Sequence, residues 1–255
     1  MTLPLTGVPR TGLPGHAVVV GDPARAAQLA ALLDAPKEVA HRREYRTFTG
    51  TWQGLPVVVA SHGIGAPGAL ILFQELARAG VTHLIRLGTA GAIRDGVGDG
   101  DLVIADAAVR DDGVTQQLVP AEYPAFAAPE AVLALQRAAR AAEAPYHRGV
   151  VWTRAAFQPG FLPLPGEAYA RAGVAAIEME LSALYVFAAT HGLVAGGALV
   201  VDGANADELV DEEATGGYDP HRGVVADGVT RGARITLDAL RLLAADVPAP
   251  PRHAR

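Results

Sequence analysis

The chain has 255 residues, half of them apolar, and a formal net charge of −6. This length and composition suit a single large α/β domain with a sizeable core, and the acidic balance argues against a protein that binds a nucleic-acid backbone. The absence of cysteine excludes disulfides, thiolate metal sites and thiol catalysis. The eight histidines lack metal-ligand spacing, and no apolar run approaches the ~20 residues of a membrane span. We expect a soluble cytoplasmic protein that binds no metal and does not associate with a membrane.

Short runs rich in valine and isoleucine recur along the chain, and each ends in a turn. Such runs are typical of strands buried on both faces, and we predict them at residues 16–22, 55–63, 82–91, 101–109, 148–155, 173–180 and 196–203. Helices are predicted at residues 23–33, 67–79, 129–142, 180–191 and 224–243. This alternation predicts an α/β fold, a single domain with a mixed, largely parallel central sheet flanked by helices.

The remaining segments complete one domain over residues 1–255. Residues 1–14 are expected to form an N-terminal arm. The Gly/Asp/Glu-rich residues 203–223 indicate a mobile surface segment, and residues 247–255 a loose tail.

Unusual residues, most of them polar, close almost every predicted strand. They are Gly21 and Asp22, Ser61 and His62, Arg86 to Thr89, Phe157, Glu178 to Glu180, and Asp202. Because ligands of open α/β sheets bind beyond the carboxyl ends of the strands, we expect these residues to share one crevice.

Two arginines near these strand ends, Arg25 and Arg86, point to an anion. Arg25 lies in the first turn of a helix that follows a glycine turn, where free N–H groups and the helix dipole attract negative charge; the alternative is an ordinary turn with a solvated arginine. Arg86 interrupts an apolar strand, which predicts either a structural salt bridge or a ligand contact. The Gly-Thr-Ala-Gly segment that follows adds N–H groups and the Thr89 hydroxyl, which suit an oxyanion.

Two further charged segments have alternative interpretations. The segment "HRREYR", residues 41–46, is either a solvated basic turn or part of a site. In "IEMEL", Glu178 and Glu180 flank Met179 at a strand end, where acids at a helix N-terminus are the simpler explanation.

Six segments in order, "GDPAR", "REYRTFTG", "SHGIGAPGALILFQEL", "IRLGTAGAI", "IEMEL" and "VVDG", resemble the hexameric nucleoside phosphorylases, the family of bacterial purine nucleoside and uridine phosphorylases. The resemblance runs from about Gly15 to Leu243. It implies a single α/β domain and a homo-hexamer built as a trimer of dimers. The implied reaction is phosphorolysis of a nucleoside to a free base and ribose 1-phosphate, with inorganic phosphate as co-substrate and no other cofactor.

The resemblance also implies roles for individual residues. Those that match the phosphate site are Gly21, Arg25, Arg43, Arg86 and Thr89, with Arg43 reaching in from the neighbouring subunit. Those that match the ribose and base site are Phe157, Glu178, Met179 and Glu180. Arginines around a phosphate dianion both bind it and orient it toward the anomeric carbon, where positive charge develops.

The residues near Phe157 and at the end of the last strand bear on the base. Uridine phosphorylases of the family place a glutamine and an arginine where this chain has about Phe161 and Pro163, which cannot make the same bonds. The purine enzymes place an aspartate at the end of a late strand, where it protonates N7 of the leaving base, and Asp202 matches it. A turn or capping aspartate is the alternative. The "VVDG" and "IEMEL" forms resemble apicomplexan purine nucleoside phosphorylases, which favours inosine or guanosine.

Two departures from the family pattern stand beside this interpretation. Relatives commonly contact the ribose 5′-hydroxyl with a histidine of the N-terminal arm, but the matching position here is near Thr2 and the first histidine is His16. An acidic residue that relatives often carry near Phe157 is also absent.

The alternative functions are a uridine phosphorylase, a phosphate-independent nucleosidase, which needs no set of arginines, and a nucleoside-binding regulatory protein without turnover.

Overall fold

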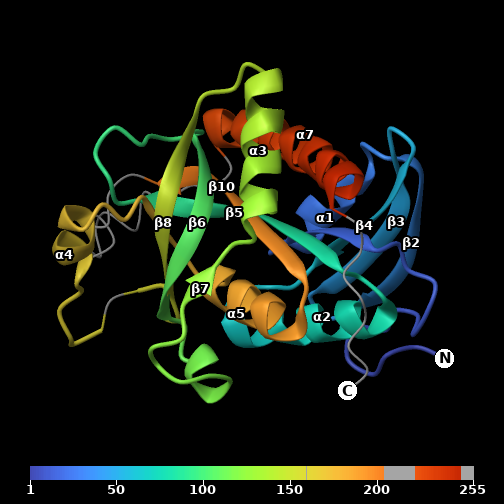
Figure 1. Cartoon of the computed structure of the whole chain (residues 1–255), viewed down its shortest axis with the longest axis horizontal. Coiled ribbons are helices and arrows are strands. Elements are labelled where there is room, and N and C mark those ends of the chain that lie inside the picture. The colour runs from blue at the N-terminus through green and yellow to red at the C-terminus, as the bar shows by residue number, and fades with distance from the viewer. Residues whose placement is uncertain (159, 204–221, 248–255) are drawn as a thin grey trace.

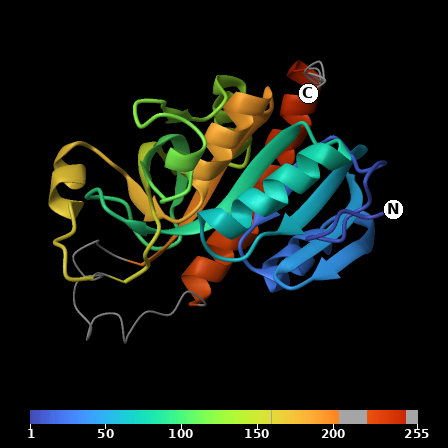
Figure 2. The same cartoon turned by 90° about the horizontal axis from the view of Figure 1, so that it is seen from below.

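A mixed β-sheet runs through the middle of the computed structural model, which describes residues 1–158, 160–203 and 222–247. Helix α3 packs against α7 on one side of the sheet, and α2 packs against α5 on the other (Figures 1 and 2). The prediction of a single α/β domain with a mixed sheet flanked by helices is confirmed.

The strands are β1 (His16–Val20), β2 (Asp34–Arg42), β3 (Tyr45–Trp52), β4 (Leu55–Ser61), β5 (His83–Ala92), β6 (Leu102–Asp111), β7 (Ala125–Phe126), β8 (Tyr146–Arg154), β9 (Ala176–Glu178) and β10 (Val194–Gly203). The helices are α1 (Pro23–Ala30), α2 (Ala66–Ala79), α3 (Pro129–Ala141), α4 (Gly166–Arg171), α5 (Leu181–His191) and α7 (Gly223–Asp246), with a short 3-10 turn at Thr115–Gln117.

The sheet order is β10-β6-β8-β9-β5-β1-β4-β3-β2, with β7 paired to β6. Strand β5 also pairs with β10, so β10, β6, β8, β9 and β5 close into a ring. Around β1 the pairings are parallel, with β4 on one side and β5 on the other. Parallel strands end at the same edge, so β4, β1, β5 and β10 bring their carboxyl ends together.

Each predicted strand and helix has a counterpart, but the predictions missed four elements: β2, β3, α4 and β7. Strand β2 is exposed along most of its length and lacks an apolar run, so its sequence carries no buried-strand signal. Helix α4 and strand β7 are too short to show a periodic pattern of apolar residues in the sequence. The predicted strand at residues 173–180 shortens to Ala176–Glu178, because the chain turns there into α5.

The apolar runs become the core. Residues Ala17 to Val20 of β1 and Val57 to Ala60 of β4 are fully buried, as expected for central strands covered on both faces. This packing fixes the strands whose ends carry the candidate site.

The predicted N-terminal arm contacts α2. The carboxylate of Glu75 accepts hydrogen bonds from the backbone N–H of Leu5 at 3.2 Å and from the N–H and hydroxyl of Thr6 at 2.8 and 2.7 Å. Most of the predicted mobile segment, residues 204–221, and of the predicted tail, residues 248–255, lies outside the described residues. Within the described ranges, no helix combines the length and apolar character needed to cross a membrane.

Candidate active site

The carboxyl ends of β1 and β4 meet at the loop that follows β4. Val20 is in register with Ser61, the N–H of His62 donates to the carbonyl of Val20 at 2.9 Å, and that of Gly63 donates to the carbonyl of Gly21 at 2.9 Å. The glycine turn after β1 is therefore bound by its backbone to the loop after β4.

The turn leads into α1 as its sequence predicts. Asp22 caps the helix by accepting a hydrogen bond from the N–H of Ala24 at 2.8 Å, and Pro23 occupies the first helical position. Arg25 follows in the first turn and is half-buried. Its positive charge thus lies at the positive end of a capped helix, an arrangement that favours an anion.

Arg86 lies within β5, and its side chain is almost fully buried. Its guanidinium folds back over Gly88, where a Cβ atom would lie 1.7 Å from Nη1, so only glycine fits at that position. Nη2 forms an ion pair with Glu180 and lies 3.7 Å from Oε2 of Glu178. Both interpretations of Arg86 stay compatible with this geometry: the salt bridge exists, and it lies among the predicted ligand-binding residues.

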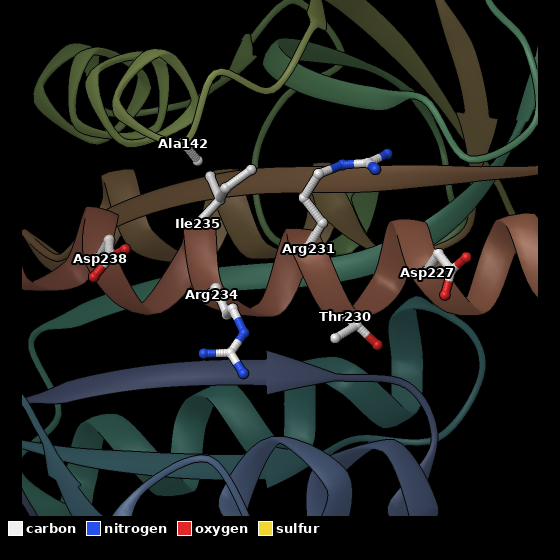
Figure 3. Close-up of a pocket in the computed structure, with 7 residues that line it drawn as sticks. All are labelled: Ala142, Asp227, Thr230, Arg231, Arg234, Ile235 and Asp238. Atoms are coloured by element: carbon white, nitrogen blue, oxygen red, sulfur yellow. The ribbon is translucent and has the colours of Figure 1, made fainter.

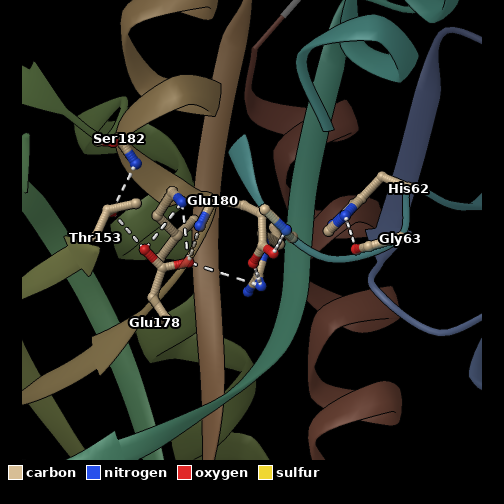
Figure 4. Close-up of polar contacts among 9 residues, drawn as sticks. His62, Gly63, Thr153, Glu178, Glu180 and Ser182 are labelled. Atoms are coloured by element: carbon tan, nitrogen blue, oxygen red, sulfur yellow. Dashed lines mark hydrogen bonds and ion pairs between the residues drawn. The ribbon is translucent and has the colours of Figure 1, made fainter. Parts of the chain in front are cut away.

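The two carboxylates of "IEMEL" have different partners (Figure 4). Glu178 accepts from the Thr153 hydroxyl and from the N–H groups of Glu180 and Leu181 at 2.8 and 2.9 Å, so it caps the start of α5. Glu180 faces the other way, toward Arg86, and accepts from the N–H of Gly65 at 2.6 Å. Glu178 thus holds the local fold, and Glu180 is the carboxylate that accepts a hydrogen bond from the arginine.

The environments shift the pKa values of these two groups in opposite directions. Burial disfavours the charged form of both. For Glu178 burial prevails over the attraction of Arg86 and raises the pKa. For Glu180 the attraction of Arg86 and the Gly65 N–H outweigh burial, and its pKa lies below the ordinary value. The surroundings therefore favour the charged form of Glu180 more strongly than that of Glu178.

The other residues of the predicted phosphate site lie at the same sheet edge or beside it. Thr89, half-buried, pairs in register with Val200 of β10. Arg43 is exposed, with a φ of 54°, in the turn between β2 and β3. The Ser61 hydroxyl holds this turn by donating to the carbonyl of Glu44 at 2.5 Å. No contact joins Arg43 to Arg86 within the described part of the chain.

The residues predicted to bind the base come from different elements. Asp202 is buried near the end of β10, two residues beyond Val200. Met179 is half-buried between the two glutamates. Phe157 is 47% exposed in the loop after β8, and Arg154 donates to its carbonyl at 3.3 Å and to that of Gln158 at 3.2 Å.

Sequence reasoning missed the groups that orient the carboxylates. Thr153 is a buried polar residue in an apolar strand, a signal that could have been followed. Gly65 acts only through its backbone N–H, which its residue type does not reveal. His62 is among the residues expected in the shared crevice, but the sequence gives it no role there.

A surface pocket lies along α7, away from these groups (Figure 3). Its lining residues are Ala142, Asp227, Thr230, Arg231, Arg234, Ile235 and Asp238. None of them is a predicted site residue, so the pocket is not the candidate active site.

Comparison with known proteins identifies the family. A sequence model described as the Phosphorylase superfamily matches residues 16–241. The chain belongs to this superfamily.

Two curated relatives illustrate its range. The chain is similar to a uridine phosphorylase of Thermococcus kodakarensis, 39% identical over 193 residues that cover 71% of this chain and 70% of the relative. It is also similar to a guanosine phosphorylase of Halorubrum lacusprofundi, 32% identical over 236 residues that cover 89% and 93%. The resemblance to nucleoside phosphorylases is confirmed, and with it the prediction of an enzyme.

The fold agrees with the sequence comparison. The crystal structure of purine nucleoside phosphorylase from Toxoplasma gondii in complex with immucillin-H superposes with a TM-score of 0.89 at 31% identity, covering 96% of this chain and 97% of that one. A uridine phosphorylase from Vibrio fischeri superposes with a TM-score of 0.84 at 28% identity, covering 94% and 97%. Purine and pyrimidine enzymes therefore share this fold, and the fold alone does not choose the base.

Proposed function

We propose that this nucleoside phosphorylase cleaves purine ribonucleosides of the inosine or guanosine type, using inorganic phosphate and no other cofactor, to free base and ribose 1-phosphate. The observation that carries the proposal is the buried group of Arg86 and Glu180, next to the glycine turn that leads to Arg25. A guanidinium suits a phosphate dianion, and a carboxylate held in its charged form suits two ribose hydroxyls.

The charges of this group match the charge that develops during the reaction. As the glycosidic bond breaks, positive charge builds on the sugar, and the phosphate and Glu180 present negative charge to it. Arg25 and Arg86 hold the phosphate for attack on the anomeric carbon, with Thr89 as a hydroxyl donor. Asp202 donates a proton to N7 so that the purine leaves neutral.

Phe161 and Pro163 support the choice of a purine. Phe161 is exposed, and Pro163 has neither a side-chain hydrogen-bond donor nor a backbone N–H, so this pair has no means of binding the amide-like edge of uracil through its side chains. Uridine is the second candidate, because several relatives that are 36% to 39% identical to this chain over 193 aligned residues are uridine phosphorylases.

One panel tests the proposal. Base release is measured from inosine, guanosine, adenosine, uridine and methylthioadenosine, with and without phosphate, and the sugar product is identified. We expect phosphate-dependent release from inosine or guanosine and ribose 1-phosphate as product. Equal rates without phosphate, with ribose as product, would indicate a nucleosidase. Faster release from uridine would replace the purine assignment, and tight binding without any release would indicate a regulatory protein.

We further propose that the enzyme is a homo-hexamer, a trimer of dimers, in which Arg43 completes the phosphate site of the neighbouring subunit. Arg43 is exposed in a turn that the Ser61 hydroxyl fixes, so its charge is available at the surface. Activity is then expected to depend on assembly, and sedimentation combined with assays at low concentration tests this. A fully active monomer would contradict it.

A further inference from the structure

His62 is a buried, neutral imidazole directly after β4. Its Nδ1 lies 2.8 Å from the carbonyl oxygen of Gly63, and because a carbonyl can only accept, Nδ1 carries the ring proton. Nε2 is then the bare nitrogen, and it has no hydrogen-bond partner among the described residues. Burial lowers the pKa of His62 to about 4, with Arg86 acting in the same direction and Glu180 against it. Among the described residues, the ring's hydrogen bond is to the carbonyl of Gly63.

The loop that His62 begins touches three parts of the candidate site. Its backbone binds the glycine turn of the predicted phosphate site through Val20 and Gly21. At Gly63 a Cβ atom would lie 2.7 Å from Cγ of Glu44, so the loop also packs against the turn that carries Arg43. At its far end, the N–H of Gly65 donates to Oε1 of Glu180 at 2.6 Å.

This loop needs a tether to hold one conformation. Gly63 and Gly65 have φ values of 76° and 93°, which glycine adopts freely but which also leave the unbound chain many alternatives. The ring of His62 packs edge-on against Phe73 of α2, with the centroids 5.8 Å apart, and so anchors the Gly63 carbonyl to the core. The neutral form of His62 matters, because a protonated ring would add a positive charge next to Arg86 and the glycine turn that leads to Arg25.

We propose that His62 is a positioning residue for Glu180. Its Nδ1–H fixes the Gly63 peptide and thereby aims the Gly65 N–H at the carboxylate. This inference rests on the proposed function, because it takes Glu180 as the group that binds the ribose. The phosphate turn is held by backbone bonds that a change of the side chain leaves in place, so the effect of losing the tether falls on the nucleoside rather than on phosphate.

The test separates the two ring nitrogens by substitution. In His62→Asn the amide places an N–H near the position of Nδ1, whereas in His62→Gln it lies near the position of Nε2. For the nucleoside that the unmodified enzyme cleaves best, we expect His62→Gln to raise KM about tenfold, the equivalent of one weakened charge-assisted hydrogen bond, with the KM of phosphate within about twofold. His62→Asn is expected to restore the nucleoside KM to within about threefold of the unmodified value.

His83 supplies the matched control. It is as fully buried and its pKa is also lowered to about 4, but it begins β5 at the opposite edge of the sheet. His83→Gln is expected to lower thermal stability and to leave both KM values within about twofold.

Three outcomes overturn the proposal: an unchanged nucleoside KM in folded His62→Gln, equal changes in both KM values, or a His62→Asn variant worse than His62→Gln. If His62→Gln does not fold, the proposal is tested by measuring the imidazole tautomers of the unmodified enzyme by ¹⁵N NMR. The His83→Gln variant then helps to assign the histidine signals. A proton on Nδ1 supports the proposal, and a proton on Nε2 overturns it. Failure of the proposed function is distinct, because the unmodified enzyme would then show no phosphate-dependent base release.

Discussion

Strand β5 carries two buried polar side chains three residues apart, and the structure treats them in opposite ways. His83, at the amino end, stacks on His16 with the ring centroids 4.8 Å apart, and burial lowers its pKa to about 4. Arg86, in register with Val19 near the carboxyl end of β1, stays charged and pairs with Glu178 and Glu180. An imidazole can lose its charge when water is removed, whereas a guanidinium cannot and must have counter-charges.

The difference shows where the protein retains a buried charge. Burying an ion pair brings little stability compared with apolar residues of the same volume, so Arg86 and its carboxylates are poor candidates for a purely structural device. They lie at the sheet edge where ligands of such folds bind, whereas His83 lies at the other edge. The comparison predicts that substitutions at the carboxyl edge change catalysis and those at the amino edge change stability.

The largest effect is expected for Asp202→Asn at the carboxyl edge. Losing a general acid typically costs about 10²–10⁴-fold in rate, and turnover of inosine should fall on that scale, with phosphate binding nearly intact. Cleavage of 7-methylguanosine, whose base already carries a positive charge, should suffer far less. Steady-state assays with both nucleosides measure this. Equal losses for the two would assign Asp202 a structural role.

Arg86→Met is expected to reduce both activity and stability. Removing a preorganised donor to a developing charge costs about 10²–10³-fold in kcat/KM. Leaving two buried carboxylates without their arginine costs about 3–5 kcal/mol in the free energy of unfolding. Urea unfolding and initial rates measure the two effects. In the control, Arg137→Met breaks an exposed pair with Asp246 and should cost less than about 1 kcal/mol. Similar losses of activity and of unfolding free energy in Arg86→Met and Arg137→Met would contradict the proposed difference between the two edges of the sheet.

The two glutamates should separate function from local structure. Glu180→Gln is expected to lower kcat/KM about 10- to 100-fold, because it weakens the charge-assisted bonds to the ribose. Glu178→Gln should lower kcat/KM about tenfold less than Glu180→Gln does. It should also destabilise the start of α5 by about 1–3 kcal/mol, since the groups that donate to Glu178 lose one of its two acceptor oxygens. Kinetics and thermal unfolding of the two variants are compared. Equal kinetic losses would place Glu178 on the ribose as well.

The smallest effect concerns pH and the amino edge. Because the folded pKa of His83 is about 4, below the 6.5 of an ordinary histidine, the unfolded chain takes up the proton first. The stability that depends on neutral His83 is complete above about pH 6.5 and is lost as the pH falls toward 4. His83→Gln should flatten the fall of the unfolding free energy between pH 7 and 5 by at most about 1.4 kcal/mol per pH unit. An unchanged slope from urea unfolding would contradict this.

The sequence by itself determined the central strands, their order with the helices, and the turn from Gly21 to Arg25. These features rest on local patterns: β-branched apolar runs, a capping aspartate and a proline at the first helical position, each readable within about ten residues. The exposed strand β2 was not predicted, because its pairing with β3 and not its own composition makes it a strand.

Only the tertiary structure decided which carboxylate accepts a hydrogen bond from Arg86. Glu178 and Glu180 are two residues apart and chemically identical, yet one caps α5 and the other meets a guanidinium 94 positions earlier and an N–H of Gly65, 115 positions earlier. The same holds for His62, whose neutrality depends on burial and on Arg86. Such differences arise because burial and long-range partners, which act only after the strands have packed side by side, fix the charge and direction of a polar group.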